Sequence, residues 1–214
     1  EFNDIKKKIL HILKNIDEYN PQSLSFLGYT YPLLNKNKEL LNKNKELLNK
    51  NKESFCKKLL DKLPSAENEF EKPEIIIGLN NAECNLNPKE YSDSLTYNSN
   101  DSIFKMNWII QSIISFNKKP SKELISILEK KIGNILKKKK QIETNYLAVA
   151  FEALCFTYAN AGNNNKTLSN KMFELLFELE QRKNCNNKLY AFLNKTSRVD
   201  ITGHIINGLV QITL

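Results

Sequence analysis

The sequence predicts an all-α protein, in the form of an α-solenoid of stacked helical hairpins with an N-terminal helical extension and an irregular linker. Three observations lead to this fold class. Apolar residues recur at helical spacing through most of the C-terminal half. One short apolar pattern returns three times there, and glycine and proline occur only 6 times each, too few for a loop-rich β-sandwich. We therefore divide the chain into a helical segment at 1–63, a linker at 64–102 and a helical-repeat domain at 103–214.

The N-terminal segment carries two helical patterns. Apolar residues between Ile5 and Ile16 fall at helical spacing, so we expect an amphipathic helix over 3–19 that ends before Pro21. Residues 33–53 are three identical copies of LLNKNKE, and a seven-residue period keeps their leucine pairs on one narrow stripe of a helix. This stripe is either a coiled-coil seam that binds a partner or the product of repeat expansion in a tolerant helix or loop.

The middle of the chain differs in charge from both its neighbours. Residues 64–105 have a net charge of −5, whereas 1–63 carry +5 and 106–214 carry +8. The end of this acidic stretch is rich in asparagine and serine, which favour turns. We expect 64–102 to be a largely irregular linker.

The C-terminal domain contains a series of apolar helical patterns separated by residues that end helices. Ser121 is an expected N-cap after the break at Pro120. Gly162 and the asparagines after it are a typical C-terminal signal for the longest pattern. The expected helices are 108–116, 121–140, 144–161, 167–180, a short one at 189–193, and a last one that begins at Asp200 or Thr202 and ends at Leu214.

Three of these helices share one order of side-chain types, namely apolar, apolar, polar, small, apolar, apolar. The copies begin at Ile109, Ala150 and Ile205, and their small residues are Ser112, Ala153 and Gly208. A unit of two helices cannot bury its apolar face alone, so such units stack on one another. A small residue in the middle of each copy would let neighbouring helices approach closely.

The copies at Ile109–Ile114 and Ile205–Val210 resemble the heptatricopeptide repeat of RAP-domain proteins, an organellar helical-repeat family whose first helix has a core like N-I-L-W-A-L-A. The resemblance covers residues 104–214 and implies an α-solenoid that binds organellar RNA, often ribosomal RNA. The family's tryptophan column is occupied here by Gln111, Glu152 and Asn207. The lysine and asparagine bias also resembles proteins of apicomplexan parasites, a lineage rich in this family.

Clusters of lysine are the candidate RNA contacts. The net charge is +8, but lysine and asparagine share A/T-rich codons and occur 30 times each, so the charge by itself does not identify an RNA-binding protein. The candidate phosphate contacts are Lys118, Lys119, Lys122, Lys137, Lys138, Lys139 and Lys140. The alternative for the last four is that they face water and complement the negative end of a helix dipole.

The sequence holds no constellation typical of an enzyme, so we expect no catalytic and no cofactor-binding residues. A P-loop, a G-x-G-x-x-G motif and a G-x-S-x-G motif are all absent. His11 and His204 have no further metal ligands at suitable spacing, and we expect no metal site. Glu174, Glu178 and Glu180 are expected to form a solvated helix face.

The cysteines give a prediction about the compartment. All four are far apart in sequence and none belongs to a C-x-x-C pair. We expect Cys155 to lie in the core and the protein to occupy a reducing compartment, which disfavours a secreted or surface protein. The chain begins with Glu1, which predicts a processed or trimmed polypeptide. No apolar run is long enough to span a bilayer.

Together these observations predict a non-enzymatic, RNA-associated helical-repeat protein. We expect a structural component of a mitochondrial ribosome or another organellar ribonucleoprotein, with RNA and neighbouring proteins as partners. No cofactor, membrane or small-molecule substrate is expected. The alternative is a protein–protein scaffold, such as a peripheral subunit of a mitochondrial complex, that makes no contact with RNA.

Overall fold

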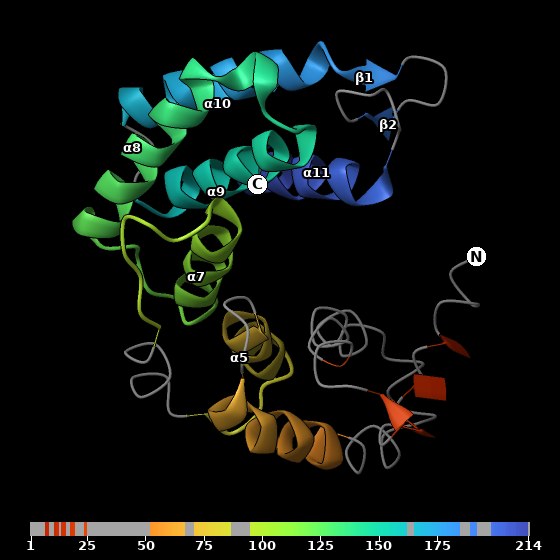
Figure 1. The fold of residues 1–214 in the computed structure, drawn as a ribbon. Coiled ribbons are helices and arrows are strands. Elements are labelled where there is room, and N and C mark those ends of the chain that lie inside the picture. The colour runs from red at the N-terminus through yellow and green to blue at the C-terminus, as the bar shows by residue number, and fades with distance from the viewer. Residues whose placement is uncertain are drawn as a thin grey trace. The chain divides into compact units, whose positions relative to one another are not determined.

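A computed structural model describes most of the chain as helix. The described residues are 7–8, 11–12, 14–15, 18–19, 24, 52–66, 71–86, 95–161, 165–184, 189–191 and 198–213. They belong to two compact units, Glu1–Leu95 and Thr96–Leu214 (Figure 1). Within these ranges the regular structure is helical apart from one two-stranded sheet, which confirms the all-α class. None of the described helices is both long and apolar enough to cross a membrane.

The main described elements of the first unit are two helices. A helix over 52–62 continues into the 3-10 turn η2 (Leu63–Ser65), and α5 (Glu71–Asn81) follows. Their apolar core is fully buried and includes Leu24, Phe55, Leu59, Ile75, Ile76 and Leu79. The prediction of an irregular linker over 64–102 is therefore wrong for α5. This helix is apolar around most of its circumference, so its sequence lacks the one-sided pattern that identifies an amphipathic helix.

The two N-terminal predictions fall mostly on residues outside the described ranges. In the expected helix over 3–19, residues 7–8, 11–12 and 14 are helical. The LLNKNKE copies lie outside the described residues as far as residue 51, and their last two residues begin the helix over 52–62. The choice between a coiled-coil seam and an expanded repeat stays a prediction.

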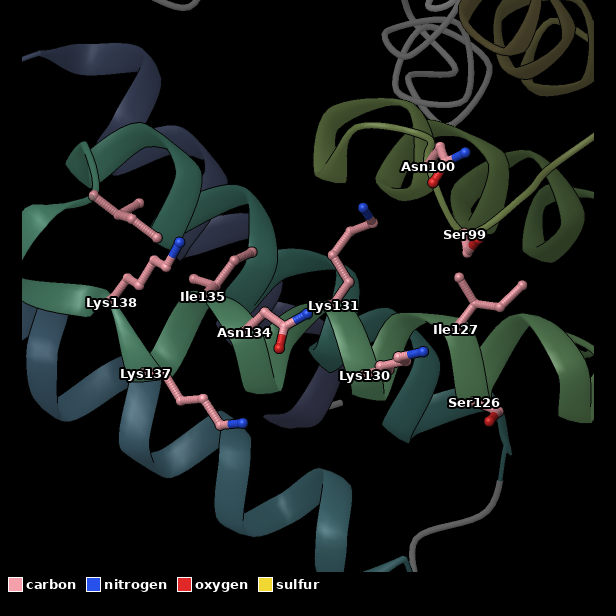
Figure 2. Close-up of a pocket in the computed structure, with 11 residues that line it drawn as sticks. Ser99, Asn100, Ser126, Ile127, Lys130, Lys131, Asn134, Ile135, Lys137 and Lys138 are labelled. Carbon is pink, nitrogen blue, oxygen red and sulfur yellow. The ribbon is translucent and has the colours of Figure 1, made fainter.

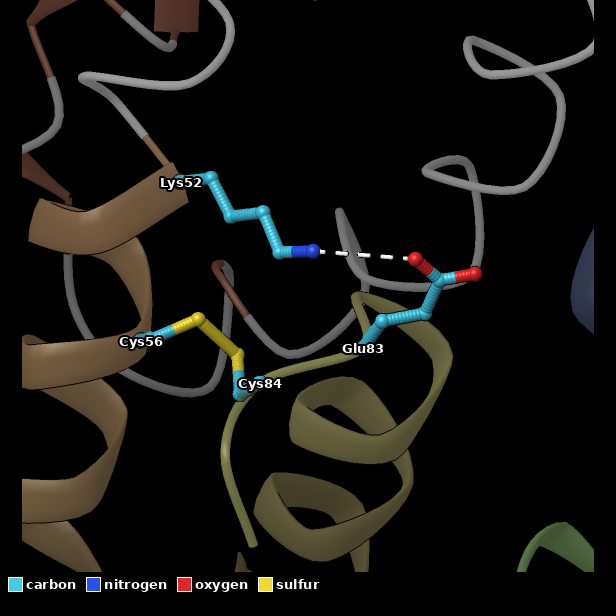
Figure 3. The surroundings of a disulfide bond; sticks show 4 residues. All are labelled: Lys52, Cys56, Glu83 and Cys84. Atoms are coloured by element: carbon cyan, nitrogen blue, oxygen red, sulfur yellow. Dashed lines mark ion pairs between the residues drawn. A yellow bond between two sulfur atoms is a disulfide. The ribbon is translucent and has the colours of Figure 1, made fainter.

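A disulfide links Cys56, in the helix over 52–62, to Cys84, in the segment just after α5 (Figure 3). Their Cα atoms are 5.6 Å apart and the bond closes a sequence separation of 28 residues. Lys52 Nζ lies 3.7 Å from Glu83 Oε2, so an ion pair spans the same two segments. Disulfides form and persist in oxidising environments. The expectation of unpaired cysteines is therefore wrong for Cys56 and Cys84, and the lack of paired cysteines no longer counts against a secreted protein. The compartment itself stays a prediction.

Reduction of this disulfide should destabilise the first unit. In the chain-entropy account a loop of this length contributes about 3–4 kcal/mol. We expect a lower unfolding midpoint in urea with reductant than without it, followed by circular dichroism. A Cys56→Ser/Cys84→Ser variant should unfold at the lower midpoint in both conditions. Alkylation of both thiols in unreduced, unfolded protein would show that the bond does not form.

Helix α9 (Thr144–Ala161) is the centre of the second unit. Every residue from Leu147 to Thr157 is buried. It packs against α7 (Ile103–Ser115), α10 (Lys166–Glu180) and α11 (Val199–Thr213), as Figure 1 shows. Helix α8 (Lys122–Lys137) packs against α7, α9 and α10. The second unit is thus an apolar helix enclosed by four others.

Capping side chains set where three of these helices begin. Ser102, Ser121 and Asn165 each accept a hydrogen bond from a backbone N–H in the first turn of α7, α8 and α10. The predicted cap at Ser121 is confirmed. Helix α7 begins earlier than the predicted start at Trp108, because the cap lies at Ser102.

Two predicted elements differ from the structure. The expected helix over 121–140 ends at Lys137, and the 3-10 turn η3 (Lys139–Gln141) follows. The expected short helix at 189–193 is wrong, since Leu189–Tyr190 forms strand β2, which pairs antiparallel with β1 (Lys183–Asn184). Tyr190 also donates a side-chain hydrogen bond to Glu180, and five residues are too few for a helix to form without tertiary support.

The small position of the third sequence copy lies at a close helix contact. Gly208 in α11 is buried, and a Cβ built on it would lie 3.1 Å from Phe151 Cε1 and 3.2 Å from the Cα of Glu152 in α9. Ser112 and Ala153, the other two small residues, are fully buried. For Gly208 the structure confirms that the small side chain lets two of the aligned helices approach closely.

Gly208→Leu should destabilise the protein by about 1–3 kcal/mol, because its side chain would overpack the contact with α9. Gly203→Leu is the matched control, since a Cβ there meets nothing within 4 Å. We expect the control to unfold at or above the midpoint of the unmodified protein, because leucine favours a helix more than glycine does. Equal midpoints for the two variants would contradict close packing at Gly208.

Candidate nucleic-acid interface

Helix α8 presents one buried face and one polar face. Leu124, Leu128 and Ile132 are fully buried, and Ile135 and Leu136 are nearly so. Because these residues anchor α8 on its neighbours, the lysine, serine and asparagine side chains between them are left on the outside. The burial of one face therefore orients the candidate site.

The outer face of α8 carries a row that we call the basic stripe, made of Lys122, Ser126, Lys130, Asn134 and Lys137. All five residues are exposed. They are spaced by four or three residues, so they follow one another along a single face of the helix. At 1.5 Å per residue the row is roughly 22 Å long. It joins two of the predicted contacts, Lys122 and Lys137, through Lys130.

A groove of about 810 Å³ runs beside the stripe. Figure 2 shows Ser99 and Asn100, from the loop before α7, on the other side of the groove from α8. The lining residues are Ser99, Asn100, Ser126, Ile127, Lys130, Lys131, Asn134, Ile135, Lys137, Lys138 and Ile142. The lining includes four ammonium groups and no carboxylate, so the groove is electropositive and offers hydrogen-bond donors from amides and hydroxyls.

The described residues do not neutralise the four groove lysines. Within the described part of the chain, Lys130, Lys131, Lys137 and Lys138 form no ion pair. Like charges this close repel one another, and only solvent ions or a bound anion can offset that repulsion. The groove therefore favours a polyanion over a neutral ligand.

The predicted run Lys137–Lys140 is divided by the structure. Lys139 Nζ lies 2.7 Å from Glu174 Oε1, and Lys140 Nζ lies 3.1 Å from Glu178 Oε2. These two lysines thus pair with α10, whereas the first two line the groove. The prediction of a solvated face for Glu178 is wrong, since its side chain is only 4% exposed.

The buried Glu178 carboxylate is compensated by two cations, Arg182 and Lys140. The Arg182 side chain is 7% exposed and lies 3.3 Å from Glu178 Oε1. The same guanidinium donates to the carbonyl oxygens of Lys139 and Ile142 and to Thr144 Oγ1. Arg182 therefore joins the end of α10 to the connection between α8 and α9.

The remaining predicted contacts lie at the opposite end of α8. Lys118 and Lys119 are exposed in the turn before the helix, which reverses at Asn117 with a φ of 56°. Asparagine tolerates this left-handed conformation better than most residues. The predicted lysines are thus distributed along the whole helix, and the structure brings only Lys137 and Lys138 into the groove.

Sequence reasoning missed the middle of the interface. Lys130, Lys131 and Asn134 were not among the predicted contacts because they do not form a run. A sequence pattern could have indicated Lys130 and Asn134: with Lys122 and Ser126 they recur every four residues, on the helix face opposite the leucines. The contribution of Ser99 and Asn100 had no sequence signal, because it comes from a loop that precedes another helix.

A second polar cluster is buried between α7, α9 and α11. Glu152 is 2% exposed and accepts hydrogen bonds from Asn107 Nδ2 at 2.7 Å and from Asn207 Nδ2. His204 Nδ1 lies 2.8 Å from the same carboxylate. These partners satisfy a charge that would otherwise be costly to bury. Glu152 and Asn207 occupy the polar column of the aligned copies, so this column links neighbouring helices.

The cluster does not activate the nearby thiol. Burial, reinforced by the charge of Glu152, raises the pKa of Cys155 to about 12. A nucleophilic cysteine needs the opposite shift, since the thiolate is the reactive form. His204 is paired with Glu152. Cys155 is buried, as predicted for a core residue.

Comparison with protein families, with curated proteins and with solved structures found no match to this chain. The described residues contain no group of three or more histidine, cysteine or acidic side chains that could hold a metal ion.

The two arginines of the chain should differ sharply in their effect on stability. Arg182→Gln would leave the buried Glu178 carboxylate poorly compensated, and we expect a loss of about 3 kcal/mol. Arg198→Gln is the control, because Arg198 pairs with Asp200 at the surface, where both side chains are more than 40% exposed. It should cost less than about 1 kcal/mol in urea unfolding. Equal losses would contradict the joining role of Arg182.

Proposed function

We propose that this chain is a non-enzymatic, RNA-associated helical-repeat protein that holds RNA phosphates on the basic stripe and in the groove of α8. The observation that carries the proposal is the set of four groove lysines that pair with no described carboxylate and lie beside amide and hydroxyl donors. A chain of phosphates is the biological polyanion that such a linear arrangement fits.

The composition of the site supports positioning rather than sequence reading. Lysine acts on phosphate as a flexible point charge, whereas arginine binds it in a fixed bidentate geometry. The lining contains lysine and no arginine. Phosphate contacts fix register and orientation but carry no sequence information. We therefore propose a binding mode that depends strongly on salt and little on RNA sequence.

The arrangement of helices supports an α-solenoid. Helix α9 lies in contact with α7 and α11, the helices that share its sequence pattern, while α8 and α10 contact each other. In this proposal α7–α8 and α9–α10 are two stacked hairpins and α11 begins a third. The mitochondrial location and the ribosomal or other ribonucleoprotein assembly rest on the family resemblance of residues 104–214.

A protein–protein scaffold is the second candidate, and one observation favours it. Val199, Ile206 and Val210 of α11 are 75%, 54% and 40% exposed. Their spacing of seven and four residues places them on one face of the helix. A scaffold that binds through this face would show no dependence of RNA affinity on the α8 lysines, because it would not bind RNA.

Replacement of Lys130, Lys131, Lys137 and Lys138 by glutamine should weaken RNA binding without unfolding the protein. We expect the slope of log affinity against log salt to fall by about 0.7 for each lost contact with single-stranded RNA. The readout is fluorescence anisotropy of labelled RNA from low to physiological salt. Circular dichroism should be unchanged, because none of the four side chains forms an ion pair with another described residue.

The matched control removes the same charge from the first unit. Lys7, Lys8, Lys14 and Lys57 are exposed there, and their replacement by glutamine should leave the salt slope nearly unchanged. If the two quadruple variants lose RNA affinity equally, the net charge of the whole protein determines binding and the site is not on α8. If the unmodified protein binds no RNA even at low salt, the scaffold is the better candidate.

A further inference from the structure

Two aromatic side chains on α10 are exposed without an evident role in folding. Phe173 and Phe177 are 62% and 66% exposed. Four other large apolar residues of α10 are buried, namely Leu168, Met172, Leu175 and Leu179. The helix is therefore held in place by its buried face, and the two rings add little to its packing.

The two rings continue a stripe on the outer face of α10. Lys166, Asn170, Phe173 and Phe177 are all exposed and are spaced by four, three and four residues. Residues at this spacing follow one another along one face, and side chains one turn apart have Cβ atoms about 5–6 Å from each other. The face presents a cation, an amide and two aromatic rings in succession.

Contacts between α8 and α10 give the register of the two helices. Lys171 Nζ donates to the carbonyl oxygen of Glu129 in α8 at 2.7 Å, whereas Glu174, further along α10, pairs with Lys139, which follows the end of α8. The helices therefore run in the same direction. Phe173 precedes the Glu174 that binds Lys139, and Phe177 follows it by one turn, so both rings lie on the part of α10 that contacts η3, just after Lys137 ends the basic stripe.

The ion pair between Lys139 and Glu174 also reduces the repulsion between Glu174 and a phosphate chain. Glu174 lies next to Phe173 in sequence, and an unpaired carboxylate there would repel a phosphate chain. Its charge is offset by Lys139 at 2.7 Å. Packed helices have axes about 8–10 Å apart, so one flexible strand can contact both outer faces.

We infer that the RNA held by the basic stripe is single-stranded, and that its bases stack on Phe173 and Phe177 while its phosphates contact α8. This inference rests on the proposed function and names its substrate class. Stacking of a base on an aromatic side chain contributes about 1–3 kcal/mol and tolerates any base. A duplex keeps its bases stacked inside, so it would use the lysines and leave the rings uncovered.

A protein partner fits these rings less well. A stable protein interface buries about 800 Å² on each partner. An aromatic side chain contributes roughly 150–250 Å² when buried. The two rings would supply about half the required area, and the rest of this face is lysine and asparagine, which are not typical of an interface core.

The test compares one labelled RNA of 20 nucleotides, free of self-complementarity, with the duplex it forms with its complement. The variant Phe173→Ala/Phe177→Ala should bind the single strand at least about tenfold more weakly than the unmodified protein. Its affinity for the duplex should change less than about twofold. Phe173→Tyr/Phe177→Tyr should retain single-strand affinity, because it keeps both rings. Ile206→Ala/Val210→Ala is the matched control, since it removes two exposed apolar side chains from α11 instead.

The outcomes separate this inference from the function on which it rests. If the alanine variant binds the single strand as the unmodified protein does, the rings do not contact bases, although the α8 lysines can still bind phosphates. If it loses affinity for strand and duplex alike while its circular dichroism is unchanged, the single-strand preference is wrong. If the unmodified protein binds neither RNA, the proposed function itself fails.

Discussion

Helix α9 can fold only if other helices enclose it, and this requirement organises the second unit. Its residues from Leu147 to Thr157 are buried on every side. The helices α7, α10 and α11 cover it directly. The buried Glu152 adds specificity to this enclosure, because its carboxylate must meet Asn107, His204 and Asn207 from two different helices. A shift of either helix would remove part of the hydrogen bonding of this buried carboxylate.

The same enclosure decides which lysines are available. Helix α8 buries its leucines against its neighbours, so its polar residues form a continuous outer row. Lys139 and Lys140, which follow α8, instead pair with Glu174 and Glu178 of α10. Four adjacent lysines that look equivalent in sequence thus divide into two that join helices and two that line the groove.

The first unit depends on a covalent constraint as well as on apolar burial. The Cys56–Cys84 bond joins the helix over 52–62 to the segment just after α5. The described core of this unit is small, and small cores gain most from a cross-link.

By itself the sequence determined the helical class, the extent of α9, the cap at Ser121 and the spacing that aligns Gly208 with Ala153. These follow from periodicity and from local capping, which act between residues close in the chain. It did not reveal α5, the disulfide, the pairing of Glu178 with Arg182, or the place of Ser99 and Asn100 beside α8. Each of those depends on contacts between separate elements. A helix that is apolar on all sides has no one-sided pattern in its sequence. The sequence also does not show which distant cysteines or charged residues will pair, because tertiary packing brings them together.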